Sequence, residues 1–141
     1  MTFPDEKYEK IGSFADAYFE HITKAAASVD RIKLAQAADV LEQTYQKNQT
    51  LYVCGNGGSA AISGTFVCDH TKLVQTDTNL TARVVSLAGN MSMLTAIAND
   101  LSYDDIFIYQ LKTLANLGDA LLTISASGDS ENIVKAATWA R

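Results

Sequence analysis

The sequence predicts an α/β fold, a three-layer parallel sheet with helices on both faces that follows an N-terminal helical hairpin. From residue 49 onward, three short apolar runs alternate with longer amphipathic runs, which is typical of parallel strands joined by helical crossovers. Before that point, apolar residues recur only at intervals of three and four, which indicates helices. Three strands alone would leave a thin sheet with an exposed edge, and the sequence stops inside an apparent helix. We therefore expect further C-terminal strands to be missing.

Two helices are expected between residues 5 and 47. Each carries one broad apolar stripe, and Ser28 or Asp30 is available as the N-cap of the second helix. The stripes comprise Ile11, Phe14, Ala15, Tyr18 and Ile22, then Ile32, Leu34, Ala35, Ala38, Leu41 and Tyr45. Helices this apolar in a small protein commonly pack against another subunit as well. We thus expect residues 1–48 to be a hairpin for oligomerisation and residues 49–141 to be the ligand-binding domain.

Three strands and four helices are expected in residues 49–141. The predicted strands are "TLYVCG" (50–55), "ARVVSLA" (82–88) and "DALLTIS" (119–125). Helices are predicted from about Ser59 to Leu73, through "MSMLTAIAND", through "YDDIFIYQLKTLA", and after "ASGDS" as far as Trp139. Cys54 and Cys68 fall in elements that we expect to lie in the core, which indicates buried, reduced thiols. Trp139 is also expected in the core.

The charge balance of the chain argues against several classes of partner. The 141 residues carry a formal net charge of −5, and the sequence pI is near 4.8. Nucleic acids and anionic membrane surfaces are recognised through positive fields, which this chain lacks. No apolar run approaches the roughly 18 residues of a membrane span, and "MTFPDEKYEK" lacks the apolar segment of a signal peptide. We predict a cytoplasmic protein that has neither a membrane nor a nucleic acid as a direct partner.

Loops rich in glycine and serine follow the first and third predicted strands, as "CGNGGS" and "SASGDS". In a doubly wound sheet, ligands bind beyond the carboxyl ends of the strands. Glycines let backbone N–H groups approach an anion closely, and the helix that follows presents its positive end. Each loop alone is also explained as a tight turn with serine N-caps. Together they favour a phosphorylated small molecule, and neither matches the dinucleotide or P-loop pattern.

These loops, with "SLAGNMSMLTAIANDLSYDDIF" and "GDALLTISASGDSENIVKAA", resemble the sugar isomerase (SIS) domain family, whose sheet is flavodoxin-like. Within that family they look most like the phosphoheptose isomerases and the related initiator-associating proteins of bacterial replication. The resemblance covers nearly the whole chain. It implies a small-molecule sugar phosphate as substrate, bound by residues 49–141. It also implies a homotetramer whose N-terminal helices form the central bundle.

The resemblance implies substrate-binding residues in three segments. The family's first substrate loop matches Asn56, Gly57, Gly58 and Ser59, and its Asn-Asp pair matches Asn99 and Asp100. The serine-rich loop that holds the phosphate in the family matches Ser125, Ala126, Ser127 and Ser130.

The helix after the first loop departs from the phosphoheptose isomerase pattern. Those enzymes carry a histidine and, four residues later, a glutamate, which together hold zinc on one helix face; the glutamate also moves the proton. The matching positions here are Thr65 and Asp69. Threonine is a poor zinc ligand, so zinc is doubtful, and no organic cofactor is expected. Adjacent residues point about 100° apart on a helix, so Cys68, Asp69 and His70 do not all face one ion.

Asp69 is the expected general base, and Asp69 and His70 are the metal-ligand candidates that this chain offers. The alternatives are a solvated helix carboxylate for Asp69 and a surface or interface histidine for His70. The remaining histidine and glutamine ligands of the family lie beyond residue 141.

The leading hypothesis for function is a phosphosugar isomerase that converts sedoheptulose 7-phosphate to a heptose 7-phosphate, ketose to aldose, through an enediol. The alternative is a non-catalytic SIS module that binds a phosphosugar or a protein partner as a regulator. A third possibility is a structural remnant that folds only within its oligomer.

Overall fold

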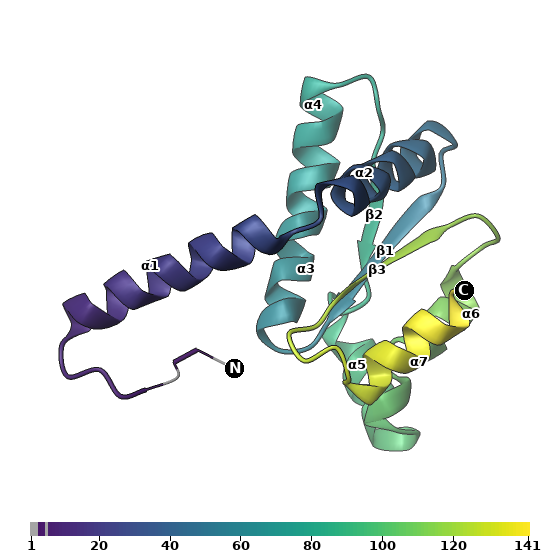
Figure 1. Cartoon of the computed structure of the whole chain (residues 1–141). Coiled ribbons are helices and arrows are strands. Elements are labelled where there is room, and N and C mark those ends of the chain that lie inside the picture. The colour runs from purple at the N-terminus through teal and green to yellow at the C-terminus, as the bar shows by residue number, and fades with distance from the viewer. Residues whose placement is uncertain (1–2, 5) are drawn as a thin grey trace. The chain divides into compact units, whose positions relative to one another are not determined.

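A computed structural model of the chain describes residues 3–4 and 6–141 (Figure 1). The chain divides into two compact units, Met1–Ala38 and Asp39–Arg141, and the boundary falls inside helix α2 (Arg31–Gln46). The expected division after residue 48 stays a prediction. Among the described residues, no helix combines the length and the apolar character that crossing a membrane requires.

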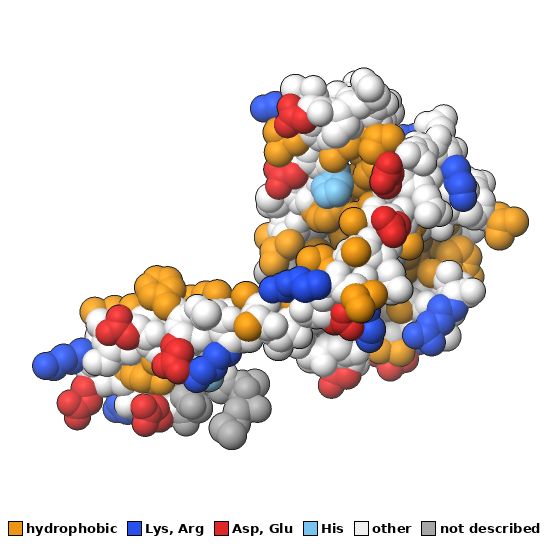
Figure 2. All heavy atoms as spheres, turned by 45° about the horizontal axis from the view of Figure 1, so that its top comes forward, with side chains coloured by type: hydrophobic (Ala, Val, Ile, Leu, Met, Phe, Trp, Pro, Cys, Tyr) orange, Lys and Arg blue, Asp and Glu red, His pale blue; other side chains and the backbone are white. Residues whose placement is uncertain are grey.

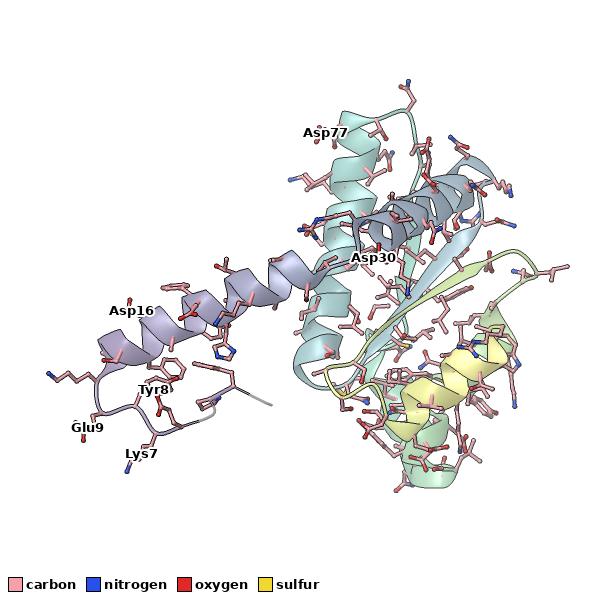
Figure 3. All side chains as sticks on the ribbon, viewed as in Figure 1. Lys7, Tyr8, Glu9, Asp16, Asp30 and Asp77 are labelled. Atoms are coloured by element: carbon pink, nitrogen blue, oxygen red, sulfur yellow. The ribbon has the colours of Figure 1, made fainter. Side chains whose placement is uncertain are left out.

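The N-terminal unit contains α1 (Ile11–Ser28), which has no buried residue. Ile11 is 83% exposed and Phe19 is 64% exposed, and Figure 2 shows hydrophobic side chains along the surface of this helix. The start of α2 is capped by Asp30, which Figure 3 labels at that position. The backbone N–H groups of Ile32 and Lys33 donate to Asp30 Oδ1 at 2.9 and 3.2 Å, which confirms one of the two caps predicted.

Three parallel strands form the sheet in the order β2-β1-β3: β1 (Thr50–Gly55), β2 (Arg83–Ser86) and β3 (Ala120–Ile124). Tyr52 of β1 pairs with Val85 of β2 and with Leu121 of β3. The central strand is buried from Leu51 to Gly55 because it has a neighbour on each side and a layer of helices on each face. The carboxyl ends of all three strands therefore lie at one edge of the sheet.

Helices cover both faces of this sheet (Figure 1). One face packs against α5 (Met91–Asp100), α6 (Ile108–Leu114) and α7 (Glu131–Trp139), and the other packs against α3 (Gly58–Asp69) and the end of α2. Successive residues of β1 divide between the two layers, since side chains alternate across a strand. Tyr52 and Cys54 belong to the first core, and Leu51 and Val53 to the second. The α/β fold class predicted from the sequence is confirmed.

Two predicted helices are interrupted. The run expected from Ser59 to Leu73 is α3, followed by a π-helical turn, η1 (His70–Val74), and by α4 (Gln75–Asp77). The run expected through "YDDIFIYQLKTLA" begins as a separate 3-10 turn, η2 (Tyr103–Asp105), before α6. Ser102 caps this turn, because its Oγ accepts the N–H of Asp104 at 3.0 Å.

Two burial predictions are wrong. Cys54 is fully buried, and its burial raises the pKa of the thiol to about 12, but Cys68 is exposed. Cys68 follows Val67, which packs on the sheet layer, so the helix turns the next residue outward. Trp139 is 41% exposed because it borders an open hollow of about 380 Å³ beside Leu121, at the end of α7. Both cysteines are free, as predicted.

Candidate functional site

The two loops predicted to bind an anion meet at one cavity of about 240 Å³. The cavity is lined by Asn56, Ser59, Ile124, Ser125, Ala126, Ser127 and Ser130. It lies beyond the carboxyl ends of β1 and β3, which are adjacent and parallel. We call it the serine cavity. The structure thus brings together the first and third segments that the sequence singled out.

The first loop turns sharply from strand into helix. Two of its glycines are required on different grounds, one by close packing and the other by its backbone conformation. A Cβ atom on Gly55 would lie 2.8 Å from the carbonyl carbon and oxygen of Ser59, closer than real side chains approach. Gly57 has a φ of +53°, in the region that favours glycine. A Cβ atom on Gly58 would meet open space. The strand end and the helix start are therefore packed too closely for a side chain at Gly55.

The second loop orders its own hydroxyl groups. The backbone N–H of Gly128 donates to Ser125 Oγ at 3.0 Å, and that of Asp129 donates to Ser127 Oγ at 3.4 Å. A serine hydroxyl that accepts a hydrogen bond still has its own O–H to donate. Ser125 and Ser127 can therefore point hydroxyl donors at an anion in the cavity.

The walls of the serine cavity are neutral, and their polar side chains are hydroxyls and one carboxamide. Two helices begin at its rim, since Ser59 is in the first turn of α3 and Ser130 precedes α7. Helix N-termini carry a partial positive charge and favour anions. A phosphate can be held here by hydroxyls and helix ends without lysine or arginine, which suits an acidic protein.

The side chain of Asn56, which lines this cavity, is hydrogen-bonded to two other residues. Its Nδ2 donates to Asn132 Oδ1 at 2.9 Å, and its Oδ1 accepts from Asn132 Nδ2 at 3.0 Å. The hydroxyl of Tyr103 donates to the same Oδ1 at 3.1 Å. Sequence reasoning missed both partners. The available signal for Asn132 was a polar residue on the buried face of α7, beside Ile133 and Ala136.

Asn99 and Asp100 lie at the exposed end of α5 and do not line the serine cavity. Asn99 Nδ2 donates to Asp100 Oδ1 at 2.7 Å. Within the described chain, the structure therefore does not bring this pair to the two loops. Tyr103, in the turn η2 that follows α5, contacts the first loop through its hydrogen bond to Asn56.

A second, mostly apolar cavity of about 380 Å³ adjoins the first loop. Its lining includes Gly55, Asn56, Met91, Leu94 and Tyr103. Asn56 lines both cavities. A larger hollow of about 680 Å³ lies in the N-terminal unit, lined by residues such as Pro4 and Phe14, and it lacks the loop chemistry of the serine cavity.

Thr65 and Asp69 are both exposed on α3, and neither lines the serine cavity. Thr65 Oγ1 donates to the carbonyl of Ala61 at 3.2 Å. Ten residues of helix separate Ser59 from Asp69, which corresponds to a rise of about 15 Å. The expected base is thus far from the expected phosphate.

His70 is packed into the layer between α2 and α3. Its Nδ1 is 2.8 Å from the hydroxyl of Tyr45, and its ring stacks on Phe66 with centroids 3.8 Å apart. Burial lowers the pKa of His70 and raises the pKa of Tyr45 to about 12. The described residues contain no group of three His, Cys, Asp or Glu side chains placed to hold a metal ion.

Comparisons with known proteins bear on the whole chain. A family model described as SIS domain matches residues 15–141. A probable phosphoheptose isomerase of Thermoplasma acidophilum is 36% identical over 121 residues, which cover 86% of this chain and 66% of that protein. A phosphoheptose isomerase of Helicobacter pylori is 36% identical over 121 residues, which cover 85% and 62%. The chain thus spans a little under two thirds of these relatives.

A solved structure resembles this fold closely. The phosphoheptose isomerase from Neisseria gonorrhoeae is 31% identical and superposes with a TM-score of 0.80, covering 92% of this chain and 68% of that one.

Proposed function

The chain belongs to the SIS domain family, and we propose that its serine cavity binds the phosphate of a phosphorylated sugar. The observation that carries this proposal is the meeting of two glycine- and serine-rich loops at one neutral cavity, where two helices begin. The phosphoheptose isomerases among its relatives support sedoheptulose 7-phosphate as the substrate. Ser125, Ser127 and Ser130 anchor the phosphate in this proposal, together with Ser59, which lines the same cavity.

The reaction that we propose is the interconversion of the ketose and aldose forms. A base takes a proton from C1 of the ketose while the C2 oxygen gains a proton, which gives the enediol. The enediol then loses the proton of its C1 hydroxyl and gains one at C2, which gives the aldose. The carbonyl of sedoheptulose 7-phosphate is at the opposite end of the molecule from its phosphate. The base in this proposal is Asp69, which lies about 15 Å along α3 from Ser59.

The proposed binding residues include the backbone of Asn56, Gly57 and Gly58 and the loop residue Ala126. Asn99 and Asp100 remain predicted contacts to the sugar. Their position outside the serine cavity means that they can contact only a part of the ligand that extends beyond it.

Zinc does not fit the donors that the described residues offer. Asp69 is a single exposed carboxylate, and Nδ1 of the neighbouring His70 is engaged by Tyr45. No step of the proposed reaction is therefore assigned to a metal, and zinc binding by Asp69 or His70 stays a prediction.

A second candidate function is a non-catalytic module that binds a phosphosugar or a protein partner as a regulator. The observation that favours it is the exposure of Asp69 outside the cavity, together with a threonine at position 65. Where the module binds a phosphosugar, both functions use the serine cavity and differ only in turnover.

The oligomer also belongs to the proposal. An 18-residue helix without any buried residue, as α1 is, has little stability of its own in water. Packing against other copies of α1 would cover Ile11 and Phe19. We propose a homo-oligomer, a tetramer by family resemblance, with residues 1–48 as its contact segment. The cytoplasmic location stays a prediction from the sequence.

The test is a proton NMR time course in D₂O with sedoheptulose 7-phosphate, with and without added zinc. New aldose signals, and deuterium at the carbon next to the carbonyl, would support the isomerase. Broadened substrate lines without exchange would support the regulatory module. Unchanged substrate lines at millimolar protein would overturn phosphosugar binding. A Ser59→Ala, Ser127→Ala protein serves as the control, because it should lose binding under either function.

A further inference from the structure

The buried carboxamide of Asn132 has no role in the phosphate binding proposed above. It is 2% exposed and lies in the first turn of α7, two residues after Ser130 of the serine loop. Its partner Asn56 lies 76 residues earlier in the chain, in the first loop. The pair therefore links the two loops that line the serine cavity.

The pair fixes one mutual orientation of the two side chains. Each carboxamide donates one hydrogen bond and accepts one, at 2.9 and 3.0 Å. A buried amide costs free energy unless it is hydrogen-bonded, and two facing amides satisfy each other only in this reciprocal arrangement. An apolar residue could fill the same space on α7 without fixing any direction. The buried amide thus determines where the side chain of Asn56 points.

The backbone near each member of the pair is ordered by a local hydrogen bond that involves a serine of the cavity. The carbonyl of Asn56 accepts the N–H of Ser59 at 2.9 Å, and the carbonyl of Ser130 accepts the N–H of Ile133 at 2.9 Å. Asn56 and Asn132 are therefore close in sequence to Ser59 and Ser130, respectively, which both line the cavity. A change in their separation would alter the gap between Ser59 and Ser130.

We propose that Asn132 is a positioning residue of the phosphate site, which acts through Asn56 to hold the two loops at a fixed separation. This proposal rests on the proposed function, since it assumes that the serine cavity binds a phosphate. Tyr103 supports Asn56 from the other side, but its side chain is 57% exposed, so its hydrogen bond competes with water and contributes less.

The test measures the binding of inorganic sulfate, a dianion with the shape of phosphate, by backbone amide shifts in the ¹⁵N-labelled chain. Sulfate reports the anion pocket alone, whatever the sugar is and whether or not turnover occurs. Asn132→Ala is expected to weaken sulfate binding about tenfold, because it removes two hydrogen bonds and leaves Asn56 Nδ2 without its acceptor. Amides of Gly57, Gly58 and Ser127 are expected to shift in the sulfate-free variant as well.

A double-mutant cycle shows whether Asn132 acts through Asn56. Asn56→Ala, Asn132→Ala and the double variant should all bind sulfate with similar affinity, within about twofold, because removing either partner already breaks the pair. Tyr103→Phe should weaken sulfate binding by less than Asn56→Ala or Asn132→Ala does. Unfolding in urea confirms that each variant is folded before its affinity is compared.

Asn132→Asp gives a conservative variant whose effect can be reversed. The carboxylate has no donor for Asn56, but a protonated carboxyl has one donor and one acceptor in the same shape as the amide. Sulfate affinity relative to wild type should therefore recover as pH falls, at a salt concentration high enough to screen charge repulsion. Asn132→Leu should show no recovery.

The outcomes separate the two proposals. Wild-type binding of sulfate at both loops, with a tenfold loss in Asn132→Ala and no further loss in the double variant, would support the positioning role. Wild-type binding with unchanged affinity in Asn132→Ala, or with additive losses in the double variant, would overturn that role alone. No sulfate-dependent shift at either loop of the wild type would overturn the phosphate site, and the positioning role with it.

Discussion

The two ends of α3 differ in how firmly the protein holds them. At the N-terminal end, Gly55 packs directly against Ser59, and Asn56 is bonded to Asn132 and Tyr103. At the C-terminal end, Asp69 is exposed, and the winding changes to a π-helical turn at the next residue. The comparison indicates that the two loops lining the serine cavity are held in place within this chain. Asp69, the proposed base, does not line the serine cavity.

Asp69→Asn should have the largest effect on turnover. It should also separate catalysis, at the C-terminal end of α3, from binding at its N-terminal end. If Asp69 is the base, turnover of sedoheptulose 7-phosphate should fall by about a thousandfold, while affinity for the sugar phosphate should stay within about twofold. The measurement is the NMR time course, combined with a substrate titration.

Asp77→Asn is the matched control, since Asp77 is an exposed carboxylate on α4 (Figure 3). It should leave both turnover and affinity unchanged. Normal turnover in Asp69→Asn would exclude Asp69 as the base.

The Ser59→Ala, Ser127→Ala protein tests the binding end. Each change removes a hydroxyl donor to a doubly charged phosphate, so the pair should weaken sugar-phosphate binding by about a hundredfold. Ser92→Ala on the exposed face of α5 removes a hydroxyl that does not line the serine cavity, and it should bind normally. Equal affinities for these two proteins would place the phosphate elsewhere.

Gly55→Ala tests how closely the strand end and the helix start are packed. The added Cβ would meet the Ser59 backbone at 2.8 Å, so we expect the free energy of unfolding to fall by about 2 to 3 kcal/mol. Gly58→Ala places the same group in open space at the start of α3 and should raise that free energy by about 0.4 to 1 kcal/mol. Urea unfolding measures both. A Gly55→Ala protein as stable as Gly58→Ala would mean that the loop is loosely packed.

His70 gives the smallest expected effect, at the other end of the helix. Burial lowers the pKa of His70, so the folded state favours the neutral ring. The Nδ1 of a neutral ring can accept a hydrogen bond from the Tyr45 hydroxyl. The stability from this preference is fully present above the unfolded pKa of about 6.5 and is lost as pH falls through the folded pKa. The free energy of unfolding of the wild type should therefore decline with acidification more steeply than that of His70→Leu. Parallel curves for the two proteins would contradict this account.

Much of the fold could be predicted because its signals are local. Glycines follow the apolar run of β1, the run "MSMLTAIAND" has a helical period, and the structure has β1 and α5 at these predicted residues. The turn at His70 could not be predicted, because its ring contacts Tyr45, which is 25 residues away. Trp139 was misplaced because periodicity gives the face of a helix but not whether another element covers that face.

The site divides in the same way. The serine and glycine loops could be predicted from the sequence, because two such clusters follow parallel strands whose carboxyl ends meet at one edge of the sheet. Asn132 could not, because its role depends on a partner in another loop. The family resemblance implied Asn99 and Asp100, and in the described structure neither residue lines the serine cavity.

The most direct test of the account is a titration of the ¹⁵N-labelled chain with sedoheptulose 7-phosphate, followed through the backbone amides. The account predicts that the largest shifts fall on residues 56–59 and 125–130, with smaller shifts along α3 toward Asp69. Shifts confined to the N-terminal unit or to the apolar cavity beside Met91, or no shifts at all, would contradict it.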